Sequence, residues 1–260
     1  MSANKRRALL VLVALGGSFV AVGLVLALVT NAGFAVVLVA LLIGVAVALA
    51  AHHKADAMVL SMTGAREVAP GEQARLLNLV ENLCVAAGLP KPRLFVLDDD
   101  APNACATGRD PKHAALVVTT GLLDKLSRIE LEAVVAHELS HIKSRDTLVS
   151  TIAATVVGTL TRPLPAPLAA RCVRWVVDAD QERQADVAGV ALTRYPPGLI
   201  SALEKIVQDP ASLRSAPRAM AHVWIEEPRS AVPSPEGGSP RPASLTRPPL
   251  EERIEALREL

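Results

Sequence analysis

The sequence has few aromatic residues and almost no net charge. Aromatic residues make up only 2% of the 260 residues, so the hydrophobic content of 51% is mostly alanine, valine and leucine. The mean hydropathy of +0.34 is high for a soluble protein. The formal net charge of +1 argues against a strongly basic surface, so we expect no nucleic-acid partner.

Cysteine is also scarce. Cys84, Cys105 and Cys172 are scattered and show no C-x-x-C spacing. An odd, scattered set is typical of free buried thiols in a reducing compartment. We therefore assign no cysteine to a disulfide framework or to a metal site.

Charged residues are absent from the 44 positions between Ala8 and Ala51. That length is enough for two membrane spans of about 20 residues each. The turn-like residues 30–33 lie near the middle, so we predict a transmembrane helical hairpin with spans at about 8–29 and 33–51. A signal peptide shares the basic start, but this apolar run is too long for one and its second half would be unexplained.

Basic residues flank the hairpin on both sides. Residues 5–7 are Lys-Arg-Arg, and residues 52–54 are His-His-Lys. Positive residues at both ends predict that both ends face the cytoplasm. We therefore expect a multi-pass protein of the cell membrane, with its N-terminus and the domain after residue 54 on the cytoplasmic side.

An H-E-x-x-H pattern occupies residues 137–141. On a helix, His137 and His141 share one face, so both imidazoles can reach one metal ion, and Glu138 can lie beside a water on that ion. Ser127 and Glu130 form a capping box before this run, which predicts a helix over about 127–144. The alternative is two chance histidines on a surface helix.

Catalytic zinc usually takes three protein ligands. Glu182 and Asp186 are four residues apart in a predicted helix, so they share a face. One can bind the metal while the other supports a ligand histidine from outside. Taken alone, the two residues also fit an exposed acidic pair.

These patterns occur in a recognisable order. The residues P-N-A-C-A-T-G at 102–108, a strand at 114–119, H-E-L-S-H-x-x-x-R-D at 137–146 and E-x-x-x-D at 182–186 follow the apolar hairpin. Together they resemble the HtpX family of membrane-bound zinc metalloproteases, relatives of the Ste24 CAAX prenyl protease. The resemblance covers roughly residues 8–225 and about 245–260.

The resemblance implies a role for each matching residue. It makes His137, His141 and Glu182 the ligands of one Zn²⁺ per chain. It makes Glu138 the general base and Asp186 the acid that orients a ligand histidine. The strand at 114–119 is similar to the family's edge strand, which pairs with an extended protein or peptide substrate.

Three further residues are candidates for substrate or transition-state contacts. Asn103 lies in the small-residue motif, His222 lies in a predicted helix at 216–225, and Arg253 matches the arginine of the family's H-P-P-x-x-x-R motif. The histidine of that motif is replaced by Arg247. This departure puts in doubt any role that the histidine has in relatives.

The chain divides into four parts. Residues 1–54 form the predicted hairpin, and residues 55–225 form the predicted protease domain, within which the apolar segment 147–177 is either a membrane-associated hairpin or a soluble one. Residues 226–249, rich in proline, serine and glycine, are a linker. Residues 250–260 form an amphipathic helix.

We therefore expect a mainly helical α+β protein with a small sheet, built like the zincin metalloproteases. The predicted function is an integral-membrane zinc endopeptidase; by resemblance, it acts in membrane-protein quality control. A membrane-anchored, non-catalytic zinc-binding scaffold is the alternative, but a structural site needs no base such as Glu138.

A prenyl-peptide protease would need an intramembrane chamber that two to four short spans cannot build. The oligomeric state and the substrate's identity are not predicted.

Overall fold

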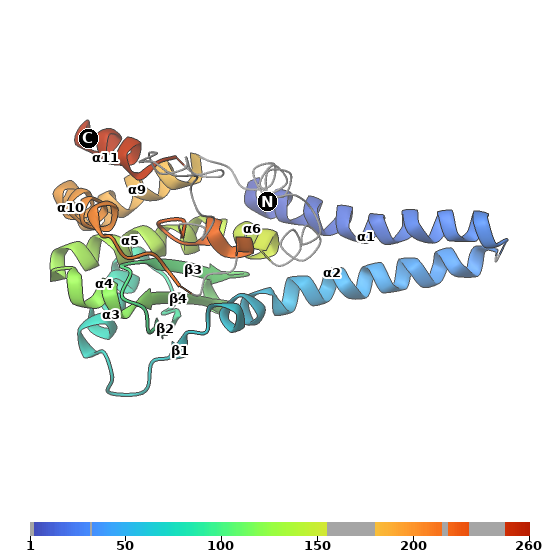
Figure 1. Ribbon diagram of the computed structural model, residues 1–260, viewed down its shortest axis with the longest axis horizontal. Helices are drawn as coiled ribbons and strands as arrows, with labels where there is room; N and C mark the ends of the chain where they lie inside the picture. Colours follow the sequence, from blue (N-terminus) through green and yellow to red (C-terminus); the bar gives the residue numbers. More distant parts are fainter. Residues whose placement is uncertain (1–2, 32, 155–179, 215–217, 229–247) are drawn as a thin grey trace, which may run out of the picture.

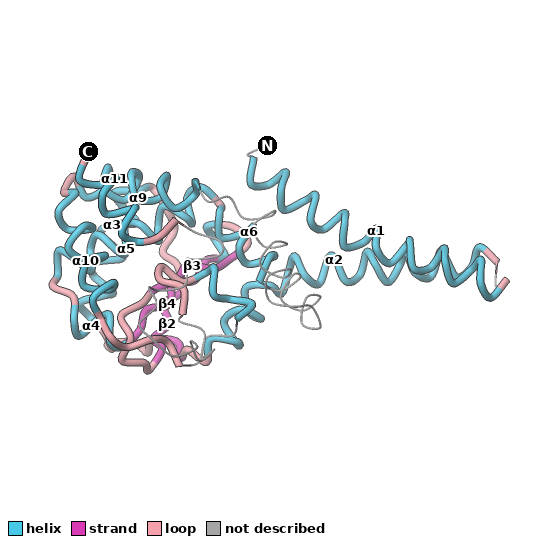
Figure 2. Tube along the Cα trace, turned by 45° about the horizontal axis from the view of Figure 1, so that its top comes forward, coloured by secondary structure: helices cyan, strands magenta, loops and turns pink. Residues whose placement is uncertain are grey.

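The computed structural model describes residues 3–31, 33–154, 180–214, 218–228 and 248–260. As the sequence predicted, the fold is mainly helical with one small sheet of four strands. Figure 1 shows two long helices that project from a compact domain, and Figure 2 shows the strands enclosed among the domain's helices.

The projecting helices are α1 (Ala3–Thr30) and α2 (Phe34–Thr63). Segments Arg6–Thr30 and Phe34–Lys54 within them are long and apolar enough to cross a membrane. Most of their large apolar side chains are exposed, as expected for a surface that faces lipid. The predicted helices are therefore present, and α2 runs 12 residues beyond the predicted end at 51 (63 − 51) into the domain.

Glycines allow the two membrane helices to pack closely. A Cβ added at Gly44 would lie 2.8 Å from the Gly16 carbonyl oxygen and 3.1 Å from the Phe19 Cβ. In lipid, such close backbone approach replaces the hydrophobic effect as a source of helix association. Close packing of the two helices, rather than an unusual backbone conformation, therefore requires a glycine at position 44.

The domain contains four strands in the order β1-β2-β4-β3. They are β1 (Arg66–Glu67), β2 (Arg93–Leu97), β3 (Ala104–Gly108) and β4 (Ala114–Thr119). Strand β2 is antiparallel to β1 and parallel to β4, and β3 is antiparallel to β4.

This order corrects one prediction. The strand at 114–119 is not an edge strand, because β2 and β3 bond to its two sides. The two outer strands are β1 and β3, and the small residues of β3 were not predicted to form a strand. Their low β-propensity is offset by burial, since every residue of β3 is buried.

Both faces of the sheet are covered. Alternate residues such as Leu94 and Leu116 pack in one apolar cluster with the domain helices, whereas Phe95 and Val117 pack with the end of α2 and with Trp224. This two-sided burial explains why residues 94–97 of β2 and residues 114–118 of β4 are apolar without alternation.

The domain helices surround this sheet. They are α3 (Ala74–Ala87), α4 (Thr120–Lys125), α5 (Arg128–Ser144), α6 (Asp146–Ile152), α9 (Asp180–Thr193), α10 (Pro196–Gln208) and α11 (Leu250–Arg258), with 3₁₀ turns η1 (Pro111–His113) and η3 (Arg218–Val223). The segment 216–225 was predicted as a helix, and its described part is the short turn η3. Most of the predicted segment 147–177 and of the linker 226–249, including Arg247, lies outside the described residues.

Helix α5 begins at the predicted capping box. The Ser127 side chain accepts from the Glu130 N–H, and the Glu130 carboxylate accepts from the Ser127 N–H. Lys205 and Ser201 of α10 also donate to Glu130. Burial raises the pKa of Glu130, but these donors outweigh it and lower the pKa to about 2. The cap therefore also fixes α5 to α10.

We expect Gly44→Leu to destabilise the hairpin by about 1–3 kcal/mol, because the new side chain forces α1 and α2 apart. Circular-dichroism melts of the detergent-solubilised protein measure the effect. Gly17→Leu is the matched control, because nothing lies within 4 Å of a Cβ at Gly17. Equal melting temperatures for the two variants would contradict the packing role of Gly44.

Candidate metal centre

Helices α5 and α9 bring three possible metal ligands together. His137 and His141 are one turn apart on α5, and Glu182 lies in the first turn of α9. One ligand atom from each lies within 4.8 Å of the other two, and all three residues are buried. The two Nε2 atoms are 3.2 Å apart, and His141 Nε2 is 3.3 Å from Glu182 Oε1.

Gly189 allows α9 to approach α5 this closely. A Cβ at Gly189 would lie 2.9 Å from the His137 main-chain nitrogen. The glycine therefore permits direct contact between the two backbones at the level of the first ligand. The contact brings Glu182, two turns earlier on α9, within reach of both imidazoles.

Each histidine is held by its own carboxylate. Asp186 Oδ1 is 2.9 Å from His137 Nδ1, and Asp146 Oδ2 is 3.3 Å from His141 Nδ1. A carboxylate accepts hydrogen bonds only, so a proton on Nδ1 of each ring would face its carboxylate, and a metal ion would take the place of the proton at Nε2. The two Nε2 atoms and the Glu182 carboxylate then face one another. A buried set of three electron donors fits a cation such as a metal ion.

The charges around the ligands support this reading. Burial lowers the pKa of His141, but Glu182, Asp146 and Glu138 outweigh it and raise the pKa to about 10. Glu138 is buried on α5 directly after His137. The local field is therefore strongly negative and favours a positive ion at the centre.

Asp146 is a contact of the candidate centre that was not assigned from the sequence. It lies five residues after His141, which on a straight helix would place it on another face. Arg145 ends α5 with φ 65°, in the left-handed region, and this bend turns Asp146 back toward His141. The R-D pair after the histidine motif was visible in the sequence, but its geometry was not.

Arg253 comes to the centre from the C-terminal helix α11. Its Nη1 lies 2.9 Å from Glu182 Oε2, and its Nε donates to Asp186 Oδ2 at 2.8 Å. Burial would raise the pKa of Asp186, but the Arg253 charge outweighs it and lowers that pKa. Arg253 was a candidate for substrate or transition-state contacts; in this structure it is 1% exposed, and its guanidinium contacts the two acids Glu182 and Asp186.

The other two candidates lie beside structural partners. Asn103 Nδ2 donates to the Glu226 carbonyl, and its Oδ1 accepts from the Glu226 and Ala104 main-chain N–H groups. His222 is buried, with Nε2 3.1 Å from the Ser150 carbonyl oxygen. Neither residue belongs to the three-ligand cluster.

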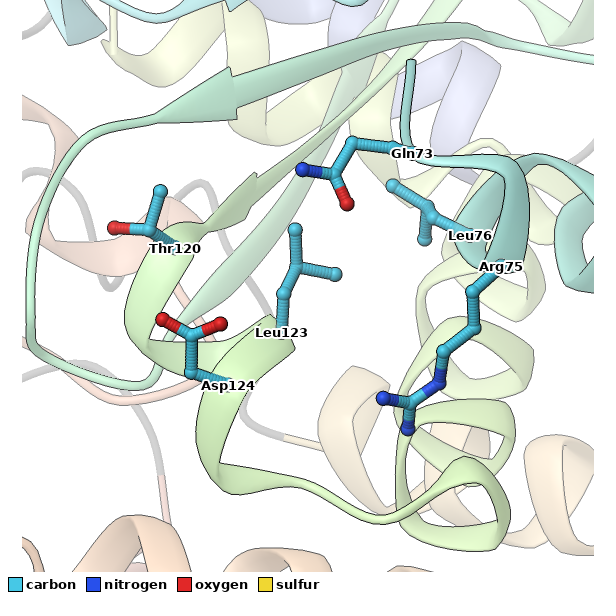
Figure 3. A pocket seen from close by; sticks show the side chains of 6 residues that line it. All are labelled: Gln73, Arg75, Leu76, Thr120, Leu123 and Asp124. Carbon is cyan, nitrogen blue, oxygen red and sulfur yellow. The ribbon is translucent and has the colours of Figure 1, made fainter. Parts of the chain in front are cut away.

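A separate hollow lies between the start of α3 and helix α4. It has a volume of about 230 Å³ and is lined by Gln73, Arg75, Leu76, Thr120, Leu123 and Asp124. Figure 3 shows Gln73, Arg75 and Leu76 at the start of α3 on one side and Thr120, Leu123 and Asp124 of α4 on the other, with Gln73 and Leu123 pointing toward one another. None of them belongs to the metal-ligand cluster, so this hollow is not part of the centre.

Comparison with known sequences decides the family. The model of peptidase family M48 matches residues 70–260, which include every member of the centre. The chain belongs to peptidase family M48. The resemblance to HtpX is therefore confirmed at the level of the family.

Several curated relatives are similar over most of their length. A "Protease HtpX homolog" of Tropheryma whipplei (strain Twist) is 38% identical, covering 78% of each chain. Those of Dictyoglomus turgidum and Streptococcus gordonii are 36% and 32% identical, the latter covering 100% of this chain and 98% of the relative. A crystal structure of S. mikatae Ste24p matches with a TM-score of 0.47 and 18% identity, covering 96% of this chain and 64% of that one.

We expect Arg253→Met to lower the unfolding free energy of the metal-free M48 protein by about 3–5 kcal/mol, because Glu182 and Asp186 then stay buried without their cation. Thermal unfolding in detergent with a chelator measures this change. Arg258→Met is the control on the same helix, since the Arg258 side chain is 60% exposed and pairs with Glu204 at the surface. Similar losses in both variants would refute the role of Arg253.

Proposed function

We propose that this M48 protein is a zinc-dependent endopeptidase anchored in the cell membrane. The observation that carries the proposal is the convergence of His137, His141 and Glu182, with Glu138 beside them. Two imidazoles and a carboxylate favour zinc among divalent ions, and three protein ligands leave a position for water.

The chain's own residues supply the rest of the chemistry. When bound, zinc lowers the pKa of a coordinated water toward about 7 and polarises a peptide carbonyl. Glu138 accepts the proton of the attacking water and later donates it to the leaving amine. Asp146 and Asp186 hold the two imidazoles with Nε2 directed inward.

The alternative, a non-catalytic zinc scaffold, explains the ligands equally well. It does not explain Glu138, a buried carboxylate that would add an unneeded negative charge beside Glu182. A structural zinc site also closes its fourth position with a protein ligand. Within the described residues, the cluster has three members.

The arrangement of the hairpin supports a membrane protease with both hairpin ends on one side. The start of α1 contacts the domain at Asp146, and α2 continues into the domain core at Val59 and Leu60. Basic residues flank both ends of the apolar run, which favours the cytoplasmic side. We propose that the substrates are membrane proteins, at segments close to the membrane surface, as in quality control.

The free edge of β3 is the proposed site for an extended substrate. Asn103 and Thr119 form a hydrogen-bonded pair, so alternation along the ladder turns the main-chain groups of Ala104, Ala106 and Gly108 outward. Ala104 O and Gly108 N already bond to Ile225 and Thr151. The Ala106 N–H and C=O bond to no other described residue, so they can pair with a substrate strand. Because β3 packs on α5, a substrate bound there lies near the centre.

We expect Glu138→Gln to lower kcat by about 100-fold or more while zinc remains bound at one per chain, because only the base is lost. Glu182→Ala should lose both zinc and activity. Metal analysis and cleavage of an unfolded protein such as casein measure the two effects. Glu132→Gln, also on α5 but outside the cluster, is the control; a Glu138→Gln enzyme with the native rate would eliminate the hydrolytic mechanism.

A second prediction tests the substrate edge. Ala106→Pro removes one outward N–H, which a sheet edge tolerates. We expect kcat/KM to fall about tenfold, mostly through KM, because one substrate hydrogen bond is lost. Ala106→Gly keeps the N–H and serves as the control. Unchanged kcat/KM in a proline variant that melts like the native protein would show that substrates bind elsewhere.

A further inference from the structure

The first membrane helix contributes one side chain to the surroundings of the metal centre. Asn4, at the start of α1, donates through Nδ2 to Asp146 Oδ1 and, at 3.2 Å, to the Ser144 carbonyl oxygen. Its Oδ1 accepts from Gln181 Nε2 at 3.4 Å. The orientation of the amide is determined, because the Asp146 carboxylate can only accept.

These partners connect both ligand-bearing helices. Asp146 contacts His141 through its other oxygen, so Asn4 is one carboxylate away from a ligand imidazole. Gln181 is buried in α9 and directly precedes the third ligand, Glu182. A single amide therefore spans from the end of α5 to the start of α9.

An apolar face of α1 holds this amide in place. Asn4, Ala8, Val11 and Leu15 follow the spacing i, i+4, i+7 and i+11, which places them on one side of the helix. Ala8, Val11 and Leu15 are buried in one cluster with Leu148, Val149, Ile152 and Ala153, from α6 and the residue that follows it. Helix α6 begins at Asp146. The seating of α1 on α6 thus fixes Asn4 relative to Asp146.

We propose that Asn4 is a positioning residue for the metal centre, through which the first membrane helix sets the metal affinity and geometry of the site. Asn4 holds the carboxylate that orients His141 and ties it to the helix that carries Glu182. This inference rests on the proposed metal-binding function. Its chemical requirement is specific: two N–H donors and one acceptor on one short side chain, which alanine lacks and aspartate cannot supply.

The test measures zinc affinity and site geometry in the full-length protein in detergent. We expect Asn4→Ala to weaken zinc binding about tenfold in competition with a chromogenic chelator, the lower end of the effect of outer-shell partners. The absorption spectrum of the Co²⁺-substituted protein should change as well, because the His141 ring is less constrained. Asn4→Asp should weaken binding at least as much, since it has no amide donor for Asp146.

Ser18→Ala is the matched control. Ser18 is also a polar residue of α1, but its hydroxyl bonds only to the Leu15 carbonyl of the same helix among the described residues. We expect it to retain native zinc affinity and the native Co²⁺ spectrum. Melting of the metal-free proteins separates positioning from folding, because Asn4→Ala should melt close to Ser18→Ala.

The outcomes distinguish this inference from the proposed function. If the native protein binds no stoichiometric zinc, the proposed function itself fails. If the native protein binds zinc, and Asn4→Ala and Asn4→Asp match its affinity and spectrum, the role of Asn4 is refuted while the metal centre stands. If Asn4→Ala and Ser18→Ala bind zinc with equal affinity, the role of Asn4 is refuted as well.

Discussion

The burial of four carboxylates around two imidazoles is the constraint on which the rest of this structure depends. Such a cluster is unstable unless positive charge compensates it, since each buried charge loses its hydration. Arg253 supplies one fixed positive charge against Glu182 and Asp186. The remaining uncompensated negative charge lies near the two imidazole Nε2 atoms, and a divalent ion fits at that point. The same electrostatics therefore account for the stability of the domain and for its proposed chemistry.

The fold satisfies this constraint by bringing together segments that are far apart in the chain. Helix α5 supplies two ligands and the proposed base, and α9 supplies the third ligand across the contact at Gly189. The last helix, α11, contributes Arg253, and the first, α1, contributes Asn4. Residues near both ends of the chain contact the centre. The packing of the membrane hairpin and of the C-terminal helix therefore affects the positions of the metal ligands. Such coupling is physical, because the Arg253 contacts are buried and the Asn4 contacts with Asp146 and Gln181 are partly buried, so their loss leaves polar partners less well satisfied.

The wrong expectation that the strand at 114–119 is an edge strand shows what a linear pattern cannot contain. Residues 114–119 are β-branched and apolar, which correctly predicts a buried strand. Whether such a strand is central or at an edge depends on which other segments pair with it. Residues 104–108 have alanine, cysteine and glycine in place of strong strand formers, so nothing local identified them as its neighbour. Tertiary burial on both faces of the sheet overrides that weak propensity.

The sequence by itself determined those features that depend on short-range periodicity. The uncharged run of 44 residues specified two helices long enough for a membrane, the capping box at Ser127 specified the start of α5, and the four-residue spacing of the histidines placed them on one face. Only the tertiary structure decided that β3 is an outer strand, that the bend at Arg145 returns Asp146 to His141, and that Arg253 and Asn4 reach the centre. The physical reason is that helix periodicity is fixed by backbone geometry within a few residues. The contacts of Asn4 and Arg253 instead depend on how segments up to 177 positions apart pack against one another, and the return of Asp146 depends on a left-handed residue that interrupts the helix.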